Sequence, residues 1–332
     1  MKILLAGNVN APWSTNFFMK KSLEQLGHKV IPFNLRPGLK NNLYLPLTQK
    51  VWYRFRQEME KGKIQRRLIG LVEKEKPDIF LLCKGKEIFP ETLREIAKRI
   101  FTVYRYIDGP VLDYVINHTK ESHCAFVTAG YLVPLLKEKT GQKYIYHLFE
   151  GCDPEIHRAV QPLSEMVCDL AIVGTGYKYR QDLAFECVKR GYNLKIWGYP
   201  NWSKRLPYQH RFAFNEDFAK VCASAKIMLG TNSHNNLPDY FSDRVFLTLA
   251  CKGFFLVKYT PGLEHWFTNK EHLVWFHNFE EAFKLIDYYL THPEQREEIA
   301  CQGQKYVYKN FTWNRVMEQM LHIISSVQLK MS

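Results

Sequence analysis

Short apolar runs alternate with helical stretches along almost the whole chain, in two consecutive series. The first series begins at Lys2 and ends near His147, and the second begins at Asp169 and ends near Leu290. Strand and helix signals that alternate in this way are typical of βαβ units, whose strands lie parallel. They predict an α/β fold of two doubly wound, Rossmann-like domains facing across a cleft. The expected strands are Lys2–Ala6, Lys29–Phe33, Ile79–Cys83, Phe101–Tyr106, Cys124–Thr128, Lys143–His147, Asp169–Val173, Leu194–Trp197, Lys226–Leu229, Phe254–Val257 and Leu273–Phe276.

The pattern is interrupted once, where Pro154 and Pro162 separate the two series. A chain of 332 residues is long enough to form two domains. We therefore expect a first domain over residues 1–160, a second over 161–312, and a closing helix over 313–332 that packs back on the first domain. The expected helices are Ser14–Leu26, Ile64–Lys74, Pro90–Arg99, Gly130–Lys139, Arg180–Arg190, Glu216–Ser224, Arg244–Cys251, Phe279–Leu290, Pro293–Asn310 and Trp313–Val327.

Composition excludes several classes of protein. With 46% hydrophobic and 24% charged residues the chain is globular, and no apolar run approaches the ~20 residues of a membrane span. The N-terminal run is short and is followed by Asn8, so we interpret it as a first strand and not as a signal peptide. The eight cysteines are scattered, without a CxxC pair, which favours buried free thiols and a cytoplasmic location.

The chain is strongly basic, with a formal net charge of +13. Such a charge favours an acidic partner: a nucleotide-sugar, a nucleic acid, an anionic polymer or an anionic membrane surface. Residues 50–67 concentrate basic side chains between aromatic ones, which suits an anionic or carbohydrate acceptor or peripheral membrane contact. Arg54 and Arg56 are the candidate acceptor-binding residues there, and a solvated basic helix is the alternative.

Common cofactor motifs are missing from the sequence. There is no GxGxxG fingerprint and no GxxxxGK[ST] loop, which argues against NAD enzymes and P-loop NTPases. Asp239 and Asp243 lie four residues apart, but the second is better interpreted as a helix cap, so no metal site is expected.

Two stretches of the second series suit phosphate binding. In Asp239–Phe267, a polar loop ending at the predicted N-cap Ser242-Asp243 precedes a short helix, a strand and a turn at Gly262. Gly174-Thr175-Gly176 follows the first strand of the series, and Arg180 comes soon after it. Backbone amides and a guanidinium group at strand ends can hold a diphosphate, although the glycines also suit an ordinary turn.

Together these residues resemble GT-B glycosyltransferases, and more narrowly the CgeB-like, "glycosyl transferases group 1" C-terminal domain. The resemblance covers roughly Asp169–Leu321, and the first half of the chain shares only the fold pattern and Asp108-Gly109-Pro110. The motifs that carry it are Asp239, Ser242-Asp243-Arg244-Val245-Phe246, Leu249-Ala250-Cys251, Tyr259-Thr260-Pro261-Gly262-Leu263-Glu264, Leu273-Val274-Trp275-Phe276, Phe279-Glu280-Glu281, Ile286-Asp287-Tyr288-Tyr289-Leu290, His292-Pro293-Glu294 and Phe311-Thr312-Trp313.

The resemblance implies a nucleoside-diphosphate sugar held mainly by the second domain, with no further cofactor. Arg180 would meet the diphosphate, with Ser242 and Arg244 beside it at a helix N-terminus. Asp239 corresponds to the first acid of the E-x7-E pattern, near the sugar. Leu247 stands where the second, ribose-binding acid belongs, and Lys252 stands where the family usually has glycine. The sugar, the base and the group that binds the ribose therefore stay open.

Other candidates follow from the predicted strand ends. Glu264 could contact the ribose or sugar, with an ordinary helix-start glutamate as the alternative. Tyr199 could stack on the base, or pack in the core. For the catalytic base that deprotonates an acceptor hydroxyl, the candidates are Asp108 and His147, the latter being equally suited to a core or hinge position. Asn8, after the first strand, is a further acceptor-binding candidate.

These inferences predict a glycosyltransferase that moves a sugar from a nucleotide-sugar to an acceptor hydroxyl. Three alternatives stay open. The first is an epimerase or hydrolase that consumes the nucleotide-sugar without an acceptor. The second is a non-catalytic nucleotide-binding protein, which Leu247 would suit. The third is a transferase whose acceptor is modified phage-type DNA.

Overall fold

A computed structural model of the chain describes residues 1–35 and 47–331, with side chains described outside residues 36–60. The chain divides into two compact units, which are described separately below. Unit 1 comprises Met1–Leu148 and Val316–Ser332, and unit 2 comprises Phe149–Arg315. Among the described residues, no helix is both long and apolar enough to cross a membrane.

The division differs from the expected boundaries in two segments, residues 149–160 and 313–315. Residues 149–160, which we had placed in the first domain, belong to unit 2. The Cys152 backbone explains this, because its N–H donates to Phe311 O (2.9 Å) and its carbonyl accepts from Trp313 N (2.9 Å). These bonds hold the segment against the last loop of unit 2.

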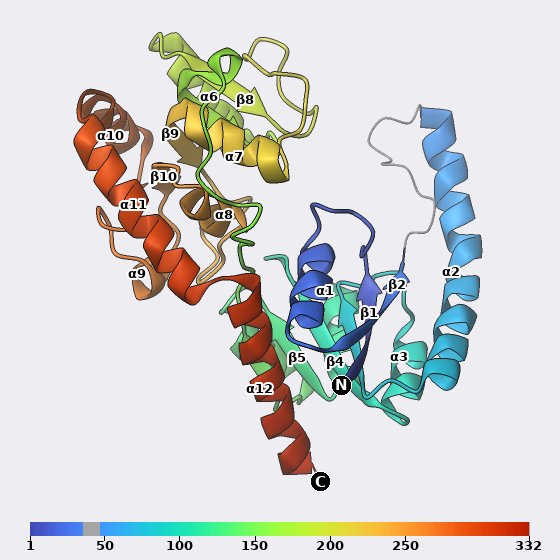
Figure 1. Cartoon of the computed structure of the whole chain (residues 1–332). Coiled ribbons are helices and arrows are strands. Elements are labelled where there is room, and N and C mark those ends of the chain that lie inside the picture. Colours follow the sequence, from blue (N-terminus) through green and yellow to red (C-terminus); the bar gives the residue numbers. More distant parts are fainter. Residues whose placement is uncertain (36–46, 332) are drawn as a thin grey trace. The chain divides into compact units, whose positions relative to one another are not determined.

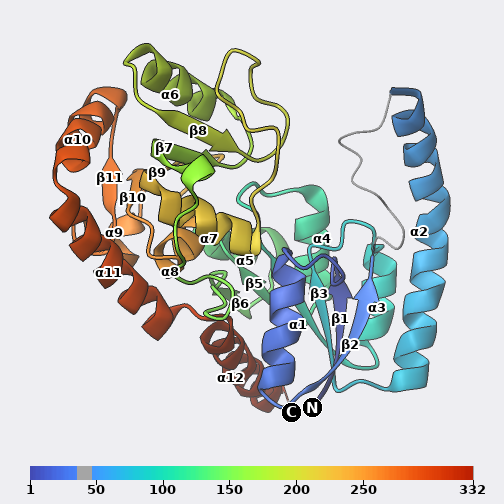
Figure 2. The same cartoon turned by 45° about the horizontal axis from the view of Figure 1, so that its top comes forward.

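Unit 1 contains a six-stranded parallel sheet in the order β2-β1-β3-β4-β5-β6 (Figures 1 and 2). The strands β3, β4 and β5 are almost wholly buried, as expected of strands covered by helices on both faces. All six expected strands are confirmed. They are β1 (Lys2–Gly7), β2 (Lys29–Asn34), β3 (Ile79–Cys83), β4 (Phe101–Tyr106), β5 (Cys124–Val127) and β6 (Ile145–His147).

The helices of unit 1 include one that we did not expect. This helix, α4, buries a histidine and a threonine beside Val115, so its sequence lacks a clear apolar stripe. A second difference is the length of α2, which begins well before the expected Ile64. The helices are α1 (Thr15–Gln25), α2 (Leu47–Glu75), α3 (Pro90–Ala97), α4 (Asp113–Glu121), α5 (Leu132–Thr140) and most of α12 (Trp313–Met331).

Unit 2 contains a five-stranded parallel sheet in the order β11-β10-β9-β7-β8, with helices on both faces (Figures 1 and 2). All expected strands and helices of this half are confirmed. The strands are β7 (Cys168–Val173), β8 (Leu194–Trp197), β9 (Ala225–Gly230), β10 (Phe255–Lys258) and β11 (Val274–Phe276). The helices are α6 (Lys178–Lys189), α7 (Asn215–Ser224), α8 (Arg244–Ala250), α9 (Leu263–Trp266), α10 (Phe279–Thr291) and α11 (Pro293–Asn310).

Both sheets have the order of a doubly wound fold, with a point at which the chain changes direction across the sheet. In unit 1 this point lies between β1 and β3, and in unit 2 between β7 and β9. At this switch point the loops that follow the two adjacent strands run in opposite directions and leave a crevice at the carboxyl edge of the sheet. Ligands of α/β proteins bind in this crevice. The two Rossmann-like units are confirmed, and the cleft expected between them stays a prediction.

All eight cysteines are free thiols, and seven of them are buried. Burial raises the pKa of Cys124 and of Cys187 to about 12, so these thiols stay protonated and unreactive at neutral pH. The expectation of buried free thiols is confirmed for all but Cys301, which is partly exposed.

Candidate functional site

The carboxyl edge of the unit 2 sheet gathers most of the residues predicted to bind the sugar donor. Gly174 follows β7, Thr231 and Asn232 follow β9, and Thr260 follows β10. Thr231, Asn232 and Thr260 are polar and at least 95% buried. Buried polar side chains at strand ends need hydrogen-bond partners, and their partners show how the site is assembled.

Arg180 connects the loop after β7 to the loop after β9, the two strands on either side of the switch point. It projects from α6 and is only 2% exposed. Its Nε donates to Thr231 Oγ1 (3.0 Å), its Nη1 to Thr175 O and its Nη2 to Thr231 O. The guanidinium group therefore holds the β7 loop against the β9 loop, and part of its hydrogen-bonding capacity is used within the protein.

Arg244 reaches the same place from the first residue of α8. A Cβ built on Gly174 would lie 2.7 Å from Arg180 Nη1 and 3.4 Å from Arg244 Nη1. Both guanidinium groups thus lie over the Gly174 α-carbon. Gly174 has a φ of 143°, which a side chain would rarely tolerate. Glycine is required here both by the backbone and by the approach of the two arginines.

The two positive charges have no carboxylate partner among the described side chains. None of the ion pairs in the described part of the chain involves Arg180 or Arg244. Burial, with a further contribution from the Arg244 charge, lowers the pKa of Arg180 to about 9. Two adjacent guanidinium groups without an acid form an electrostatic site for an anion.

Asn232 connects the remaining loops of this edge. Its Nδ2 donates to Thr260 Oγ1 (2.8 Å), and its Oδ1 accepts from Ser242 N (3.0 Å). The Ser242 amide is therefore already bonded within the protein. Because Ser242 lies two residues before Arg244, these bonds also fix where α8 begins.

The predicted N-cap of α8 is not formed by a side chain. The cap position is Asp243, whose backbone is helical and whose side chain makes no capping hydrogen bond. The backbone carbonyls of Ser242 and Asp243 accept from Val245 N (3.1 Å) and Leu247 N (2.9 Å) instead. The helix start is thus where the sequence predicted it, but it depends on the Asn232 contact and not on a side-chain cap.

Asp239 is fixed against the loop that follows β10. Its N–H donates to Pro261 O (2.8 Å), and its Oδ1 accepts from Trp266 Nε1 (3.1 Å) with His265 Nδ1 at 3.4 Å. A Cβ on Gly262 would overlap this carboxylate, and Gly262 has a φ of 92°. The structure therefore brings Asp239 and Gly262 together, as the predicted donor site requires.

The other predicted donor residues lie at the same edge. Glu264 is exposed and accepts from Tyr259 Oη with both oxygens (3.0 and 2.9 Å). Tyr199 follows β8 and packs edge-on against Phe212, with ring centroids 5.1 Å apart. Leu247 packs against the apolar core of unit 2, and Lys252 forms an ion pair with Glu297.

Three of the catalytic and acceptor candidates, Asp108, His147 and Asn8, lie at the carboxyl edge of the unit 1 sheet. Asp108, after β4, forms an ion pair with Lys84 Nζ (2.7 Å) after β3. His147 ends β6, with its Nε2 3.2 Å from Thr128 O. The structure shows no contact between these two residues, and β5 separates their strands. Asn8 accepts from Ser14 Oγ through its carbonyl (2.6 Å), while the side chains of Arg54 and Arg56 lie outside the described residues.

Sequence reasoning missed Asn232, Thr231 and Thr260 as members of the site. The available signal was a pair of polar residues directly after an apolar strand, in Leu229-Gly230-Thr231-Asn232. Among the side chains of residues 1–35 and 61–331, no group of three or more histidine, cysteine, aspartate or glutamate residues could hold a metal ion.

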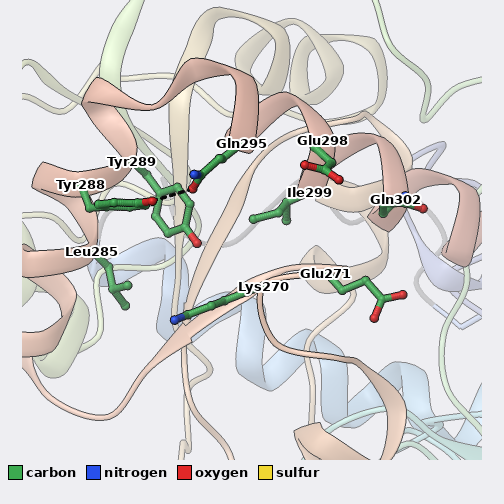
Figure 3. A pocket seen from close by; sticks show the side chains of 9 residues that line it. All are labelled: Lys270, Glu271, Leu285, Tyr288, Tyr289, Gln295, Glu298, Ile299 and Gln302. Carbon is green, nitrogen blue, oxygen red and sulfur yellow. Dashed lines mark hydrogen bonds between the residues drawn. The ribbon is translucent and has the colours of Figure 1, made fainter.

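A separate hollow of about 550 Å³ lies between α10, α11 and the segment before β11 (Figure 3). In this hollow Tyr288 Oη donates to Gln295 Oε1 (2.9 Å), and Lys270 and Glu271 come from the segment before β11. Since β11 begins at Val274, the hollow is at the start of that strand and not at the carboxyl edge that carries Arg180.

One family model matches the part of the chain that carries this candidate site. The sequence model of a family described as "Glycosyl transferase-like" matches residues 180–322, which includes Arg180, Asn232, Arg244 and Glu264. This part of the chain is similar to a glycosyltransferase domain. The expected enzyme class is confirmed at this level, and the match does not separate the CgeB-like branch from the rest. No curated protein sequence matches the chain.

Solved structures of other proteins are similar in fold to the whole chain. A glycosyltransferase from Rickettsia africae superposes with a TM-score of 0.70 at 13% identity, covering 98% of both chains. Sucrose-phosphate synthase from Thermosynechococcus elongatus superposes with a TM-score of 0.71 at 11% identity, covering 99% of this chain and 100% of the other. HepE from Anabaena, in complex with UDP and glucose, has a TM-score of 0.63 at 12% identity, covering 98% and 100%. The GT-B fold is confirmed.

Proposed function

We propose that the protein transfers a sugar from a nucleoside-diphosphate sugar to an acceptor hydroxyl, with the diphosphate bound at the carboxyl edge of unit 2. The observation that carries the proposal is the convergence of Arg180 and Arg244 on Gly174 without a carboxylate partner in the described part of the chain. The arginines lie at the switch point between β7 and β9, where α/β folds bind phosphorylated ligands.

The chemistry of the transfer suits this arrangement. The acceptor oxygen bonds to the anomeric carbon, the bond from that carbon to the diphosphate oxygen breaks, and the acceptor proton passes to a base. Negative charge grows on the departing diphosphate, so fixed guanidinium groups stabilise the transition state more than the bound substrate. Arg244, partly exposed and without an internal partner in the described part, would contact the diphosphate directly, and Arg180 would supply charge and hold the loops.

The remaining roles follow from the contacts of each candidate. We assign the sugar to Asp239, whose carboxylate is held by Trp266 and the Gly262 turn. We assign the ribose to Glu264, because the side chain of Leu247 cannot accept a hydrogen bond. Tyr199 would stack on the base. The base that takes the acceptor proton would be Asp108, kept near Lys84.

Relatives and composition support narrower proposals. HepE from Anabaena is solved with UDP-glucose, which supports a UDP-sugar as a first donor to test. The motifs Asp239–Arg244 and Tyr259–Glu264 support the CgeB-like branch, and the basic charge supports an anionic or carbohydrate acceptor. We further propose a cytoplasmic location, since all eight cysteines are unpaired.

A thermal-shift screen with UDP, GDP, ADP, CDP and dTDP tests the donor site. One nucleotide should stabilise the protein, by about 2.7 kcal/mol at a hundredfold excess over Kd. The stabilisation should disappear in Arg244→Ala, whose own unfolding temperature should stay near that of the parent. No shift with any nucleotide, or an equal shift in the variant, would contradict the diphosphate site. Consumption of the nucleotide-sugar without acceptor, above slow background hydrolysis, would indicate the hydrolase or epimerase alternative instead.

A further inference from the structure

The loop after β8 fixes the carbonyl group of Gly174. Trp202, which is 7% exposed, donates from its Nε1 to Gly174 O (3.0 Å). A Cβ built on Gly198 would lie 2.2 Å from the same oxygen, and Gly198 has a φ of 133°. The indole ring of Trp202 also packs on Gly176, where an added Cβ would lie 3.0 Å from its Cδ2. The Gly174 carbonyl is therefore held toward the loop after β8.

The direction of this carbonyl decides the direction of the next amide. No peptide bond among the described residues is cis, and in a trans peptide the carbonyl and the following N–H point in opposite directions. The Thr175 N–H therefore points away from the loop after β8. Because β7 lies between β8 and β9 in the sheet, this direction leads to the side of β9 and of the switch point.

The Thr175 N–H is also the one backbone donor of residues 174–176 that has no partner in the described part of the chain. Gly174 N donates to Trp197 O (2.9 Å), and Gly176 N donates to Asn201 Oδ1 (2.8 Å). Thr175 is partly exposed, so its amide is not sealed inside the core. Backbone amides need a hydrogen-bond partner, and at the end of a strand that precedes a helix a phosphate oxygen suits them.

We propose that the Thr175 N–H is a third hydrogen-bond donor to the diphosphate, and that Trp202 is the positioning residue that aims it. The inference rests on the diphosphate site proposed above, in which Arg180 and Arg244 lie over the α-carbon of the preceding residue, Gly174. A donor that is already aimed costs no reorganisation when negative charge grows on the departing diphosphate.

The indole N–H carries this role because it opposes rotation of the peptide between residues 174 and 175. A rotated peptide would turn the Gly174 oxygen toward the diphosphate, where it would repel the anion, and would turn the Thr175 N–H away from it. Trp202 binds that oxygen and so favours the productive orientation. A tryptophan that acted through packing alone would need its ring but not its N–H.

A phenylalanine substitution separates these two contributions. Trp202→Phe removes the N–H and keeps an aromatic ring beside Gly176. Trp197→Phe is the matched control, because the buried Trp197 Nε1 has no hydrogen-bond partner among the described residues. The Trp197 carbonyl that binds Gly174 N is unchanged in this control. Calorimetric titration with inorganic pyrophosphate and with the nucleoside diphosphates measures affinity, and unfolding temperatures confirm that both variants are folded.

Trp202→Phe should bind pyrophosphate at least about fivefold more weakly than the parent, whereas the control should change by less than about twofold. Equal affinity in Trp202→Phe and the parent would overturn the inference. An equal loss in Trp197→Phe would also overturn it, because packing would then account for the effect. In both cases the arginine site proposed above would remain in place.

An NMR measurement tests the amide itself. The chain is labelled with ¹⁵N-threonine, and the signal of Thr175 is the one that disappears in Thr175→Ser. Pyrophosphate should move this amide proton downfield in the parent, as a hydrogen bond to an anion does, and less far in Trp202→Phe. A parent that binds pyrophosphate without movement of the Thr175 signal would overturn the inference alone. A parent that binds neither pyrophosphate nor any nucleoside diphosphate would overturn the donor site as well.

Discussion

Arg180 and Arg244 come from different helices and place their guanidinium groups over the α-carbon of one glycine, Gly174. Their surroundings differ. Arg180 is 2% exposed and bonded to the loops after β7 and β9, whereas Arg244 is partly exposed and has no bond to a described side chain. Arg180 therefore both stabilises the fold and lines the candidate site, whereas Arg244 only lines the site.

Leucine substitutions should separate these two roles. Arg180→Leu leaves Thr175 O and Thr231 O without their donor and should lower the free energy of unfolding by about 2–4 kcal/mol. Arg244→Leu should change it by less than about 0.5 kcal/mol, because no hydrogen bond or ion pair in the described part of the chain depends on this partly exposed side chain. Each variant should bind the nucleoside diphosphate at least about tenfold more weakly. Urea unfolding and calorimetry measure both quantities, and an Arg180 variant as stable as the parent would disprove its structural role.

Gly174→Ala should disrupt the meeting point of the arginines. The new Cβ would lie 2.7 Å from Arg180 Nη1, which is pinned, at a φ of 143°. We expect loss of nucleotide binding and a lower unfolding temperature. Gly191→Ala is the matched control, because Gly191 has a φ of 82° and nothing within 4 Å of the added Cβ. The control should lose only about 1 kcal/mol of stability and keep its affinity. Similar nucleotide affinity in the two variants would show that the arginines do not need the space above Gly174.

Alkaline pH should affect stability and binding in opposite directions. The pKa of Arg180 is lowered to about 9 in the folded protein from an ordinary value of 12.5. As pH rises through 9, the folded protein releases this proton while the unfolded chain retains it, so the Arg180 contribution to stability increases. Over the same range the site loses a positive charge and nucleotide affinity should fall. Other groups titrate in this range too, so the measurement is the difference between the parent and Arg180→Leu across pH 8 to 10; identical profiles would refute the assignment.

Asn232→Ala should loosen the loops that carry Asp239 and Arg244. It removes the bonds to Ser242 N and Thr260 Oγ1, which are 3.0 and 2.8 Å long. Leaving buried groups unpaired should lower stability by about 1–3 kcal/mol, and displacement of α8 should weaken nucleotide binding. Asn236→Ala, an exposed position on the same loop, is the control and should change neither quantity measurably. Unchanged nucleotide affinity in Asn232→Ala would show that Asn232 does not position the site.

Asp108→Asn tests the catalytic base. The amide keeps the size of the side chain but cannot take a proton, so the transfer rate should fall by about a hundredfold or more. Nucleotide affinity should not change, because that site is in unit 2. The alternative base is His147, and His147→Ala is measured in parallel with the donor found in the thermal-shift screen. Loss of transfer in the histidine variant alone would move the assignment to His147.

The strands were predictable because buried parallel strands are continuous apolar runs. Ile79–Cys83, Phe101–Tyr106 and Leu194–Trp197 match the structure at both ends. The helix α4 was not predictable in the same way, since it covers the sheet with His118 and Thr119 as well as Val115. Apolar periodicity identifies an element only when its buried face is apolar.

The sequence by itself determined the two α/β series, the glycine before α6 and the arginines assigned to an anion. It could not show that Arg180 bonds across to Thr231, 51 residues away, or that Asn232 bonds to Thr260, 28 residues away. Those contacts depend on the strand order, which places β9 between β7 and β10. Local pattern therefore identified the elements and several of the side chains that we propose to bind the donor. Tertiary structure decided which of them meet, because hydrogen-bond partners at a sheet edge are chosen by neighbours in space and not by spacing along the chain.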